Sequence, residues 1–220
     1  MKAATQEHTL TFDPIGHRYT LDGRAVGGVT TIINDTVRRP ELERFREWVG
    51  TEEADRRRDE AATHGTLLHA AAATIAADLE DIPFGMEAGF AESYRQFSEW
   101  FTTNVDDVVA TEVPVYDATW WYAGTADAIV KLKGRKTYDL ADWKTTAKVY
   151  SSVLMQTAAY RHAAQQMFDV TIGGRIVVLV PRKREGQELQ PLSMHRLDHH
   201  TQDFNAFSHC LALWRWQKGT

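Results

Sequence analysis

The stretch Lys136–Thr146, KTYDLADWKTT, is the segment around which the rest of the chain can be arranged. Its aromatic and aliphatic residues are typical of a strand, and Gly134 just before it predicts a turn. Because side chains alternate between the two faces of a strand, we expect Asp142 and Lys144 on one face and Trp143 on the other, inside the packing. A carboxylate and an ammonium placed this way can hold a divalent cation and activate a water molecule beside it. An isolated D-x-K is more often a surface ion pair, so the case for a metal site depends on the other segments of the chain.

The composition is that of an ordinary globular protein. The chain has 220 residues, 43% of them hydrophobic and 25% charged, which predicts one domain, or one domain with a small appendage. Its single cysteine, Cys210, excludes an intrachain disulfide framework, a cysteine zinc site and a cysteine-ligated iron–sulfur cluster. The sequence has no apolar run of membrane-spanning length and no apolar signal segment, so we expect a cytoplasmic protein without a membrane partner.

Helical and strand patterns alternate along the chain and predict an α/β protein. Pro40 and Gly50 mark the start and the break of a long helical region. The expected elements are a β-hairpin at 8–22, helices at 29–37, 40–79, 86–103, 147–168 and 201–216, and strands at 108–116, 122–132, 137–144, 175–181 and 192–197. In the helix at 86–103 the aromatic residues are spaced as a stripe that faces the core.

Charge is unevenly distributed. The net charge of -5 argues against a protein that coats nucleic acid through its whole surface, but six basic residues and only two acidic residues lie between Lys131 and Lys148. Arg182-Lys183-Arg184 adds a second basic cluster, and together the two predict a phosphate-facing groove. The run Arg56-Arg57-Arg58 is flanked by acidic residues, which favours a solvated, ion-paired helix face.

Five short patterns follow one another in a recognisable order. They are G-T-x-x-H (Gly65 to His69), a strand carboxylate (Glu112), G-x-x-D (Gly124 to Asp127), D-x-K (Asp142 to Lys144) and Q-x-x-x-Y (Gln156 to Tyr160). The set resembles the RecB-type exonuclease branch of the PD-(D/E)XK nuclease superfamily. The resemblance implies a mixed sheet of four or five strands with helices on both sides, in a nuclease domain at 39–220 that follows an N-terminal β-hairpin appendage at 1–38. At the first pattern, Gly65 and the small residues after it are expected to permit close helix packing.

The resemblance also implies the catalytic groups. Asp127 and Asp142 would be carboxylate ligands of Mg²⁺ or Mn²⁺, with the backbone carbonyl of Trp143 and the imidazole of His69 as further ligands. Lys144 would orient or deprotonate the attacking water and offset the charge of the phosphate.

Three further residues complete the expected catalytic set. Glu112 would be a carboxylate in the outer shell of the metal site, in contact with the ligands and not with the metal ion, or it would bind a second metal ion. Gln156 and Tyr160 would position the substrate or brace the site, although a structural helix face explains their spacing nearly as well.

Substrate contacts are expected from the basic groove and from one turn. Thr145 would bond a phosphate oxygen, and Lys148, Arg182 and Lys183 would line the groove. Trp120 and Trp121 lie in the turn before the strand of Asp127, where indole rings can stack on unpaired bases. The alternative for these two rings is packing beneath the N-terminal hairpin.

These features predict a metal-dependent exonuclease that hydrolyses DNA from single-stranded or frayed ends, with a recombination or single-strand-binding protein as a candidate partner. The helix-rich stretch Pro40–Thr103 could arch over the site and admit only a threaded strand. The chain lacks both the cluster-binding cysteines of some relatives and a G-x-x-x-x-G-K-[ST] loop, so neither an iron–sulfur cluster nor ATP is expected.

Three alternatives remain open at this point. The first is an endonuclease or nickase on the same fold. The second is a DNA-binding module that has lost catalysis, which the intact Asp127, Asp142 and Lys144 argue against. The third is a metal-free structural protein.

Overall fold

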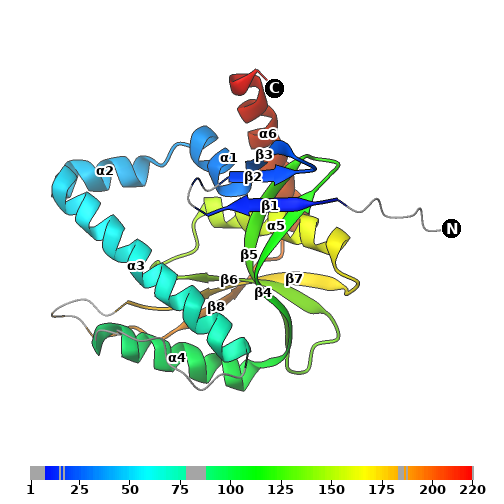
Figure 1. The fold of residues 1–220 in the computed structure, drawn as a ribbon. Coiled ribbons are helices and arrows are strands. Elements are labelled where there is room, and N and C mark those ends of the chain that lie inside the picture. Colours follow the sequence, from blue (N-terminus) through cyan, green and yellow to red (C-terminus); the bar gives the residue numbers. More distant parts are fainter. Residues whose placement is uncertain are drawn as a thin grey trace.

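The computed structural model describes residues 8–14, 16, 18–77, 88–182, 186 and 188–219, apart from the side chains of 88 and 89. These residues form six helices and one open, mixed sheet of eight strands (Figure 1). The strands are β1 (Leu10–Asp13), β2 (Arg18–Leu21), β3 (Arg24–Gly28), β4 (Val105–Asp117), β5 (Tyr122–Leu132), β6 (Tyr138–Lys144), β7 (Ile172–Leu179) and β8 (Ser193–Arg196). The helices are α1 (Val29–Thr36), α2 (Pro40–Val49), α3 (Thr51–Ala76), α4 (Ala88–Asn104), α5 (Ser151–Met167) and α6 (His200–Lys218).

Strand β5 organises the sheet. One of its edges pairs antiparallel with β4 along the whole strand. The other edge pairs parallel with β3 at Tyr122 and Ala123, and antiparallel with β6 at residues 128–130. The segment 124–127 between these two partners therefore has no ladder partner on that edge, and this break positions the candidate site.

Helices cover both faces of the sheet, so the chain has two main hydrophobic cores. Helices α1, α5 and α6 pack on one face around Tyr122, Ile129 and Leu140. Helices α3 and α4 pack on the other face around Val130 and Trp143. A sheet covered in this way is a layered α/β architecture, as the alternating helical and strand patterns predict.

Most predicted elements are confirmed within a few residues, including the helix break at Gly50 and the aromatic stripe of α4. The sheet has more strands than the four or five that the resemblance implies, because β1–β3 extend it through the parallel pairing of β3 with β5. Residues 1–7, 78–87, 183–185 and 187, on which parts of the predictions fall, lie outside the described part of the chain. Within that part, no helix is both long and apolar enough to cross a membrane.

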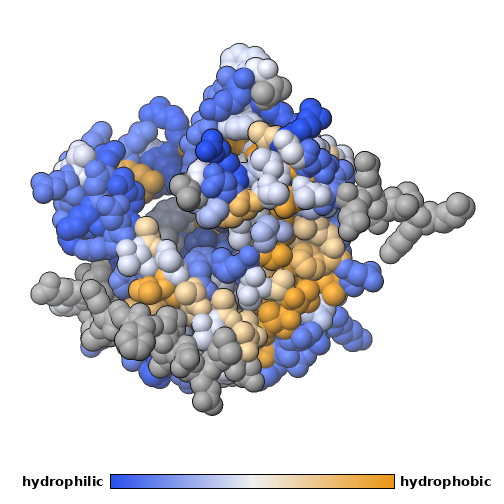
Figure 2. All heavy atoms as spheres, in the orientation of Figure 1, coloured by the Kyte–Doolittle hydropathy of each residue, from blue (hydrophilic) through white to orange (hydrophobic). Residues whose placement is uncertain are grey.

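Helix α2 and the first half of α3 stand away from the sheet. Helix α2 has no buried residue, and the buried residues of α3, Leu68, Ala71 and Ala72, all lie in its second half. In Figure 1 these helices project to one side of the sheet, and Figure 2 shows the surface hollowed between this hydrophilic lobe and the body of the molecule. We call this projecting segment, α2 with the first half of α3, the arch; its predicted role over the site stays a prediction.

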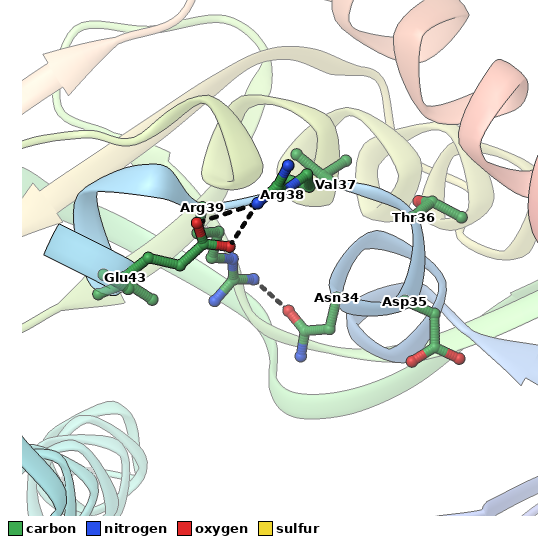
Figure 3. Close-up of a pocket in the computed structure, with 8 residues that line it drawn as sticks. Asn34, Asp35, Thr36, Val37, Arg38, Arg39 and Glu43 are labelled. Carbon is green, nitrogen blue, oxygen red and sulfur yellow. Dashed lines mark hydrogen bonds and ion pairs between the residues drawn. The ribbon is translucent and has the colours of Figure 1, made fainter. Parts of the chain in front are cut away.

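Polar contacts anchor the arch at its root. A cavity of about 380 Å³ lies between α1 and α2 (Figure 3). Across it, Arg38 donates to Glu43 of α2 at 3.1 Å, and Arg39 donates to Asn34 of α1. These contacts link α2 to α1 and to the segment between the two helices.

Candidate metal centre

The break in the pairing of β5 is filled by Asp127. Its Oδ2 accepts a hydrogen bond of 2.8 Å from the backbone amide of Trp143, on β6 just beyond the last β5–β6 pair. The carboxylate therefore replaces a missing ladder acceptor, which holds Asp127 in place at 5% exposure. The predicted role of the Trp143 carbonyl as a metal ligand stays a prediction, while its indole is buried against α4, as expected.

Three side chains from three elements converge beside this break. The Nδ1 atom of His69 on α3 lies 2.8 Å from Oε1 of Glu112 on β4 and 3.7 Å from Oδ1 of Asp127. One ligand atom from each of the three lies within 4.8 Å of the other two, a spacing that suits a shared metal ion. Glu112 adopts a φ of 46°, a left-handed conformation that a non-glycine residue rarely takes inside a strand. Backbone strain of this kind is typical of functional positions.

Asp142 and Lys144 form the second half of the site. As predicted, they share one face of β6, and Lys144 Nζ donates to Asp142 Oδ1 at 2.7 Å. Lys144 Nζ also lies 3.9 Å from Asp127, which links the pair to the three-residue cluster. The amide of Gln156 on α5 donates weakly to the same Asp142 oxygen at 3.4 Å.

Burial changes the proton affinities at this pair. Burial raises the pKa of Asp142 to about 7, although Lys144 acts against this rise. For Lys144, burial alone would lower the pKa of the ammonium, but Asp142 and Asp127 outweigh it and the pKa is raised. For His69, burial also acts to lower the pKa, and the hydrogen bond to Glu112 and the charge of Asp127 raise it overall. The site therefore attracts positive charge.

The donor set fits a divalent cation. Three carboxylates face one ammonium, and Oδ2 of Asp142 is buried without a hydrogen-bond partner among the described residues. A buried carboxylate oxygen without a donor is costly, and a bound cation removes that cost. Carboxylate oxygens suit Mg²⁺, and the additional imidazole suits Mn²⁺.

Tyr160 closes the site from α5. Its ring lies on Gly124, where an added Cβ would be only 2.3 Å from Cε1 of the ring. Burial raises the pKa of Tyr160 well above its ordinary value, so the phenol stays protonated and hydrogen-bonds to Gln156. The G-x-x-D and Q-x-x-x-Y patterns therefore meet in space, because the glycine of the first makes room for the tyrosine of the second.

One neighbour of the site, Tyr19, is not predicted by the sequence patterns. The hydroxyl of Tyr19 on β2 lies 2.9 Å from that of Thr125, inside the break in β5, and burial raises the pKa of Tyr19. Tyr19 is also close enough to Tyr160 to act on its pKa. The only signal for Tyr19 was its alternation in the hairpin, and such alternation does not reveal which distant strand lies alongside.

The predicted substrate residues lie around the same end of the sheet. Thr145 is half-buried and Lys148 is exposed, both in the loop that follows β6, and Lys148 Nζ lies 5.2 Å from the centre of the Tyr150 ring. Arg182 is half-buried two residues beyond Val180, whose amide donates to the carbonyl of Lys144 at 2.8 Å. Lys183 lies outside the described residues.

The two tryptophans of the β4–β5 turn are not part of this cluster. Tyr122, which follows them, is five residues from Asp127, about 17 Å along a strand. The Trp121 indole packs on the N-terminal hairpin and donates to the carbonyl of Ala25 at 3.4 Å, and Trp120 packs edge-on against Phe204 of α6. For Trp121 the geometry favours the packing alternative.

Two expectations about α3 have different outcomes. The ion-paired face is confirmed, because Arg56, Arg57 and Arg58 all pair with carboxylates of the same helix. The close packing expected at Gly65 is wrong, since a Cβ added there would meet no atom of the other described residues within 4 Å, the adjoining backbone of α3 aside. Gly65 lies in the second half of α3, which packs on the sheet through Leu68, Ala71 and Ala72, but Gly65 itself faces away from these contacts.

No known protein family matches the chain, and neither does any curated protein.

Proposed function

We propose that this protein is a divalent-metal-dependent nuclease with a PD-(D/E)XK-type core that hydrolyses phosphodiester bonds from DNA ends. The observation that carries the proposal is the meeting of His69, Glu112 and Asp127 with the Asp142–Lys144 pair at one break in the sheet. These residues come from α3, β4, β5 and β6, so their convergence is a property of the fold.

The residues suited to hold the ion are Asp127, Asp142 and His69, with Glu112 as a direct ligand or as the hydrogen-bond partner that orients the imidazole. When bound, Mg²⁺ or Mn²⁺ supplies charge neutralisation for the phosphate and lowers the pKa of a coordinated water. His69 binds a metal only in its neutral form, so metal binding and protonation of this ring compete.

Lys144 contributes charge and orientation. Because Asp142 and Asp127 raise its pKa, the side chain remains an ammonium at neutral pH. An ammonium donates hydrogen bonds to the attacking water or to a phosphate oxygen, and it offsets the negative charge that grows in the transition state. Gln156 donates to the same Asp142 oxygen as Lys144, and Tyr160 hydrogen-bonds to Gln156, so these two residues of α5 help to hold the Asp142 carboxylate in place.

The projecting helices support the choice of an exonuclease. The arch of α2 and the first half of α3 leaves the hollow seen in Figure 2, and His69 lies on the same helix further along. If the arch encloses the substrate strand in this hollow, the strand must enter by a free end. Arg182 and Lys148 lie on the sheet end that carries Lys144, where they would contact the backbone phosphates.

The experiment is a cleavage assay on end-labelled linear DNA, single- and double-stranded, with Mg²⁺, Mn²⁺ or EDTA. Asp142→Asn and Lys144→Ala should each slow cleavage about 10²–10³-fold, the effect of losing a transition-state contact of about 3–4 kcal/mol. Matched controls are Asp106→Asn and Lys136→Ala, which remove the same charges from exposed positions.

The controls should cleave like the wild type, and EDTA should abolish activity. Wild-type cleavage rates in either site variant, in a folded protein, would refute the assignment. Cleavage that continues in EDTA would refute the metal dependence.

A further inference from the structure

A second polar cavity lies at the other end of β6 and β7. The two strands are parallel, and the Asp142–Lys144 pair lies near the carboxyl end of β6. The cavity, of about 310 Å³, opens at the opposite end, beside Gly173 and Gly174 at the start of β7. The volume is at the lower end of the range of about 300–1,000 Å³ typical of small-molecule sites. The proposed nuclease activity makes no use of this cavity.

Four arginines from four parts of the fold line the cavity. They are Arg135 after β5, Arg161 on α5, Arg175 on β7 and Arg196 on β8. Their sequence separation explains why no basic run points to this cluster.

Two of the four guanidinium groups are neutralised inside the protein. Arg175 donates to Asp203 at 2.6 Å, and Arg196 lies 3.1 Å from the buried carboxylate of Asp139. These two ion pairs hold the side chains of Arg175 and Arg196 in place. The net charge of the cavity therefore depends on the other two arginines.

The remaining two guanidinium groups have no carboxylate partner among the described residues. Arg161 donates its Nε to the backbone carbonyl of Ile172 at 2.9 Å, and the Arg135 side chain is exposed at the rim. Asp198 also lines the cavity, so two cations face one carboxylate. The balance favours an anionic occupant.

Buried donors add to this preference. The Nε of Arg175, a residue only 1% exposed, and the Nδ1 of His200 are buried without a hydrogen-bond partner in the described part of the chain. His200 is the first residue of α6 and lines the cavity, so the positive end of the α6 dipole lies near it. Burial and the neighbouring charge of Arg175 lower the pKa of Arg161, and burial with Arg161 and Arg175 lowers the pKa of His200 to about 4. The cavity thus has a positive potential and unused donors.

We propose that this cavity binds a phosphate group, with Arg135 and Arg161 as its charged contacts and Arg175 and His200 as buried donors. A planar guanidinium with several N–H donors matches the geometry of a phosphate. A neighbouring cavity of about 300 Å³ shares Arg161 and His200 with the arginine-lined cavity and is also lined by Trp120. The phosphate group could therefore belong to free phosphate or to a phosphorylated small molecule. The organic part of such a molecule would lie in the neighbouring cavity.

The experiment is titration calorimetry on the full chain in EDTA, with inorganic phosphate and adenosine monophosphate as two separate probes at constant ionic strength. EDTA keeps both probes from binding through a metal at the nuclease site, and Asp142→Asn provides a second background in which that site is disabled. The test is thus independent of nuclease activity.

Arg135→Ala tests the site, and Lys136→Ala is its matched control. Both remove one positive charge from exposed neighbouring positions, but only Arg135 lines the cavity. We expect saturable phosphate binding that Arg135→Ala weakens about tenfold or more and Lys136→Ala changes less than about twofold. The same binding should persist in Asp142→Asn.

Comparison of the two probes identifies the source. Tighter binding of adenosine monophosphate that falls to the level of phosphate in Trp120→Ala indicates a phosphorylated small molecule, and equal binding of both probes indicates phosphate alone. Absence of saturable binding by either probe, or equal losses in Arg135→Ala and Lys136→Ala, would overturn the proposal.

Discussion

At the scale of single residues, the candidate site concentrates charge that folding alone does not require. Asp127, Asp142 and Glu112 lie near one ammonium, Glu112 has a strained backbone, and one Asp142 oxygen has no described donor. Such arrangements lower stability and are kept at functional positions. A bound divalent cation would raise the stability of the folded protein, because it binds the folded chain and not the unfolded one.

The first prediction concerns His69, with His64 as a control on the same helix. If His69 is a metal ligand, His69→Ala should raise the Mn²⁺ concentration needed for half-maximal activity at least about tenfold and reduce the rise in melting temperature that Mn²⁺ gives. His64 packs edge-on against Phe90, so His64→Ala should lower the melting temperature and leave the metal titration unchanged. Metal titrations of activity and of thermal stability distinguish the two. A His69→Ala variant with a wild-type metal requirement would show that the ring is structural.

The second prediction concerns pH. Burial, Arg161 and Arg175 lower the pKa of His200 to about 4, whereas the unfolded chain takes up this proton near 6.5. Stability from this residue is therefore complete above about pH 6.5 and is lost as the pH falls towards 4. His162, with a pKa that burial also lowers, acts in the same direction.

Because the His200 ring is partly exposed, we expect a loss of only about 1 kcal/mol from it between pH 7.5 and 5.0. Urea unfolding at the two pH values should show a smaller difference for His200→Phe, which cannot be protonated. An equal difference in the variant and the wild type would assign the pH dependence to other groups.

At the scale of elements, β5 and α5 depend on one close contact. A Cβ at Gly124 would lie 2.3 Å from the ring of Tyr160, so Gly124→Ala must displace that ring. The third prediction is a loss of about 1–3 kcal/mol in unfolding free energy together with slower cleavage, because Tyr160 braces Gln156 and Asp142.

Gly65→Ala is the control for this substitution. Its Cβ would meet no atom of the other described residues within 4 Å, and the residue lies within α3, so the change should stabilise the protein by about 0.5–1 kcal/mol. Denaturant unfolding measures both changes. A Gly124→Ala variant as stable as the wild type would mean that Tyr160 is free to move.

The β4–β5 turn gives the fourth prediction. Trp121 packs against the N-terminal hairpin, and Arg24 lies over its ring at 5.5 Å. We expect Trp121→Ala to lower the melting temperature while the affinity for single-stranded DNA, measured by fluorescence anisotropy, stays unchanged. A weakened affinity in a fully stable variant would instead assign base stacking to this ring.

At the scale of the whole molecule, the projecting α2–α3 segment gives the fifth prediction. If a strand must enter through the hollow beside it, the enzyme needs a free end. Linear DNA should be lost with release of nucleotides or short oligonucleotides, and covalently closed circles, single- or double-stranded, should survive the same incubation. Gel analysis of matched linear and circular substrates measures this. Linearisation of circles as fast as linear DNA is lost would favour an endonuclease and leave the metal chemistry in place.

Local patterns were enough to predict most elements of the fold. Period-2 and period-3.6 repeats, with glycines and prolines at the breaks, predict most helices and strands of the described chain within a few residues, but they do not predict β3. The same alternation placed Asp142 and Lys144 on one face and Trp143 in the core. Both depend on backbone geometry that extends over only a few residues, which is why the sequence determined them.

The tertiary structure decided what depends on contacts between distant segments. It paired β3 with β5, which brought Tyr19 of the neighbouring β2 to Thr125. It also left Gly65 without close neighbours among the described residues, whereas Gly124 lies directly against the ring of Tyr160. It also gathered four arginines from separate elements into one cavity. The periodicity of a short segment does not predict contacts between distant segments, because those contacts depend on which strand edges pair and where the pairing stops. The break between β3 and β6 along β5, which positions Asp127 beside the amide of Trp143, exists only in the assembled sheet.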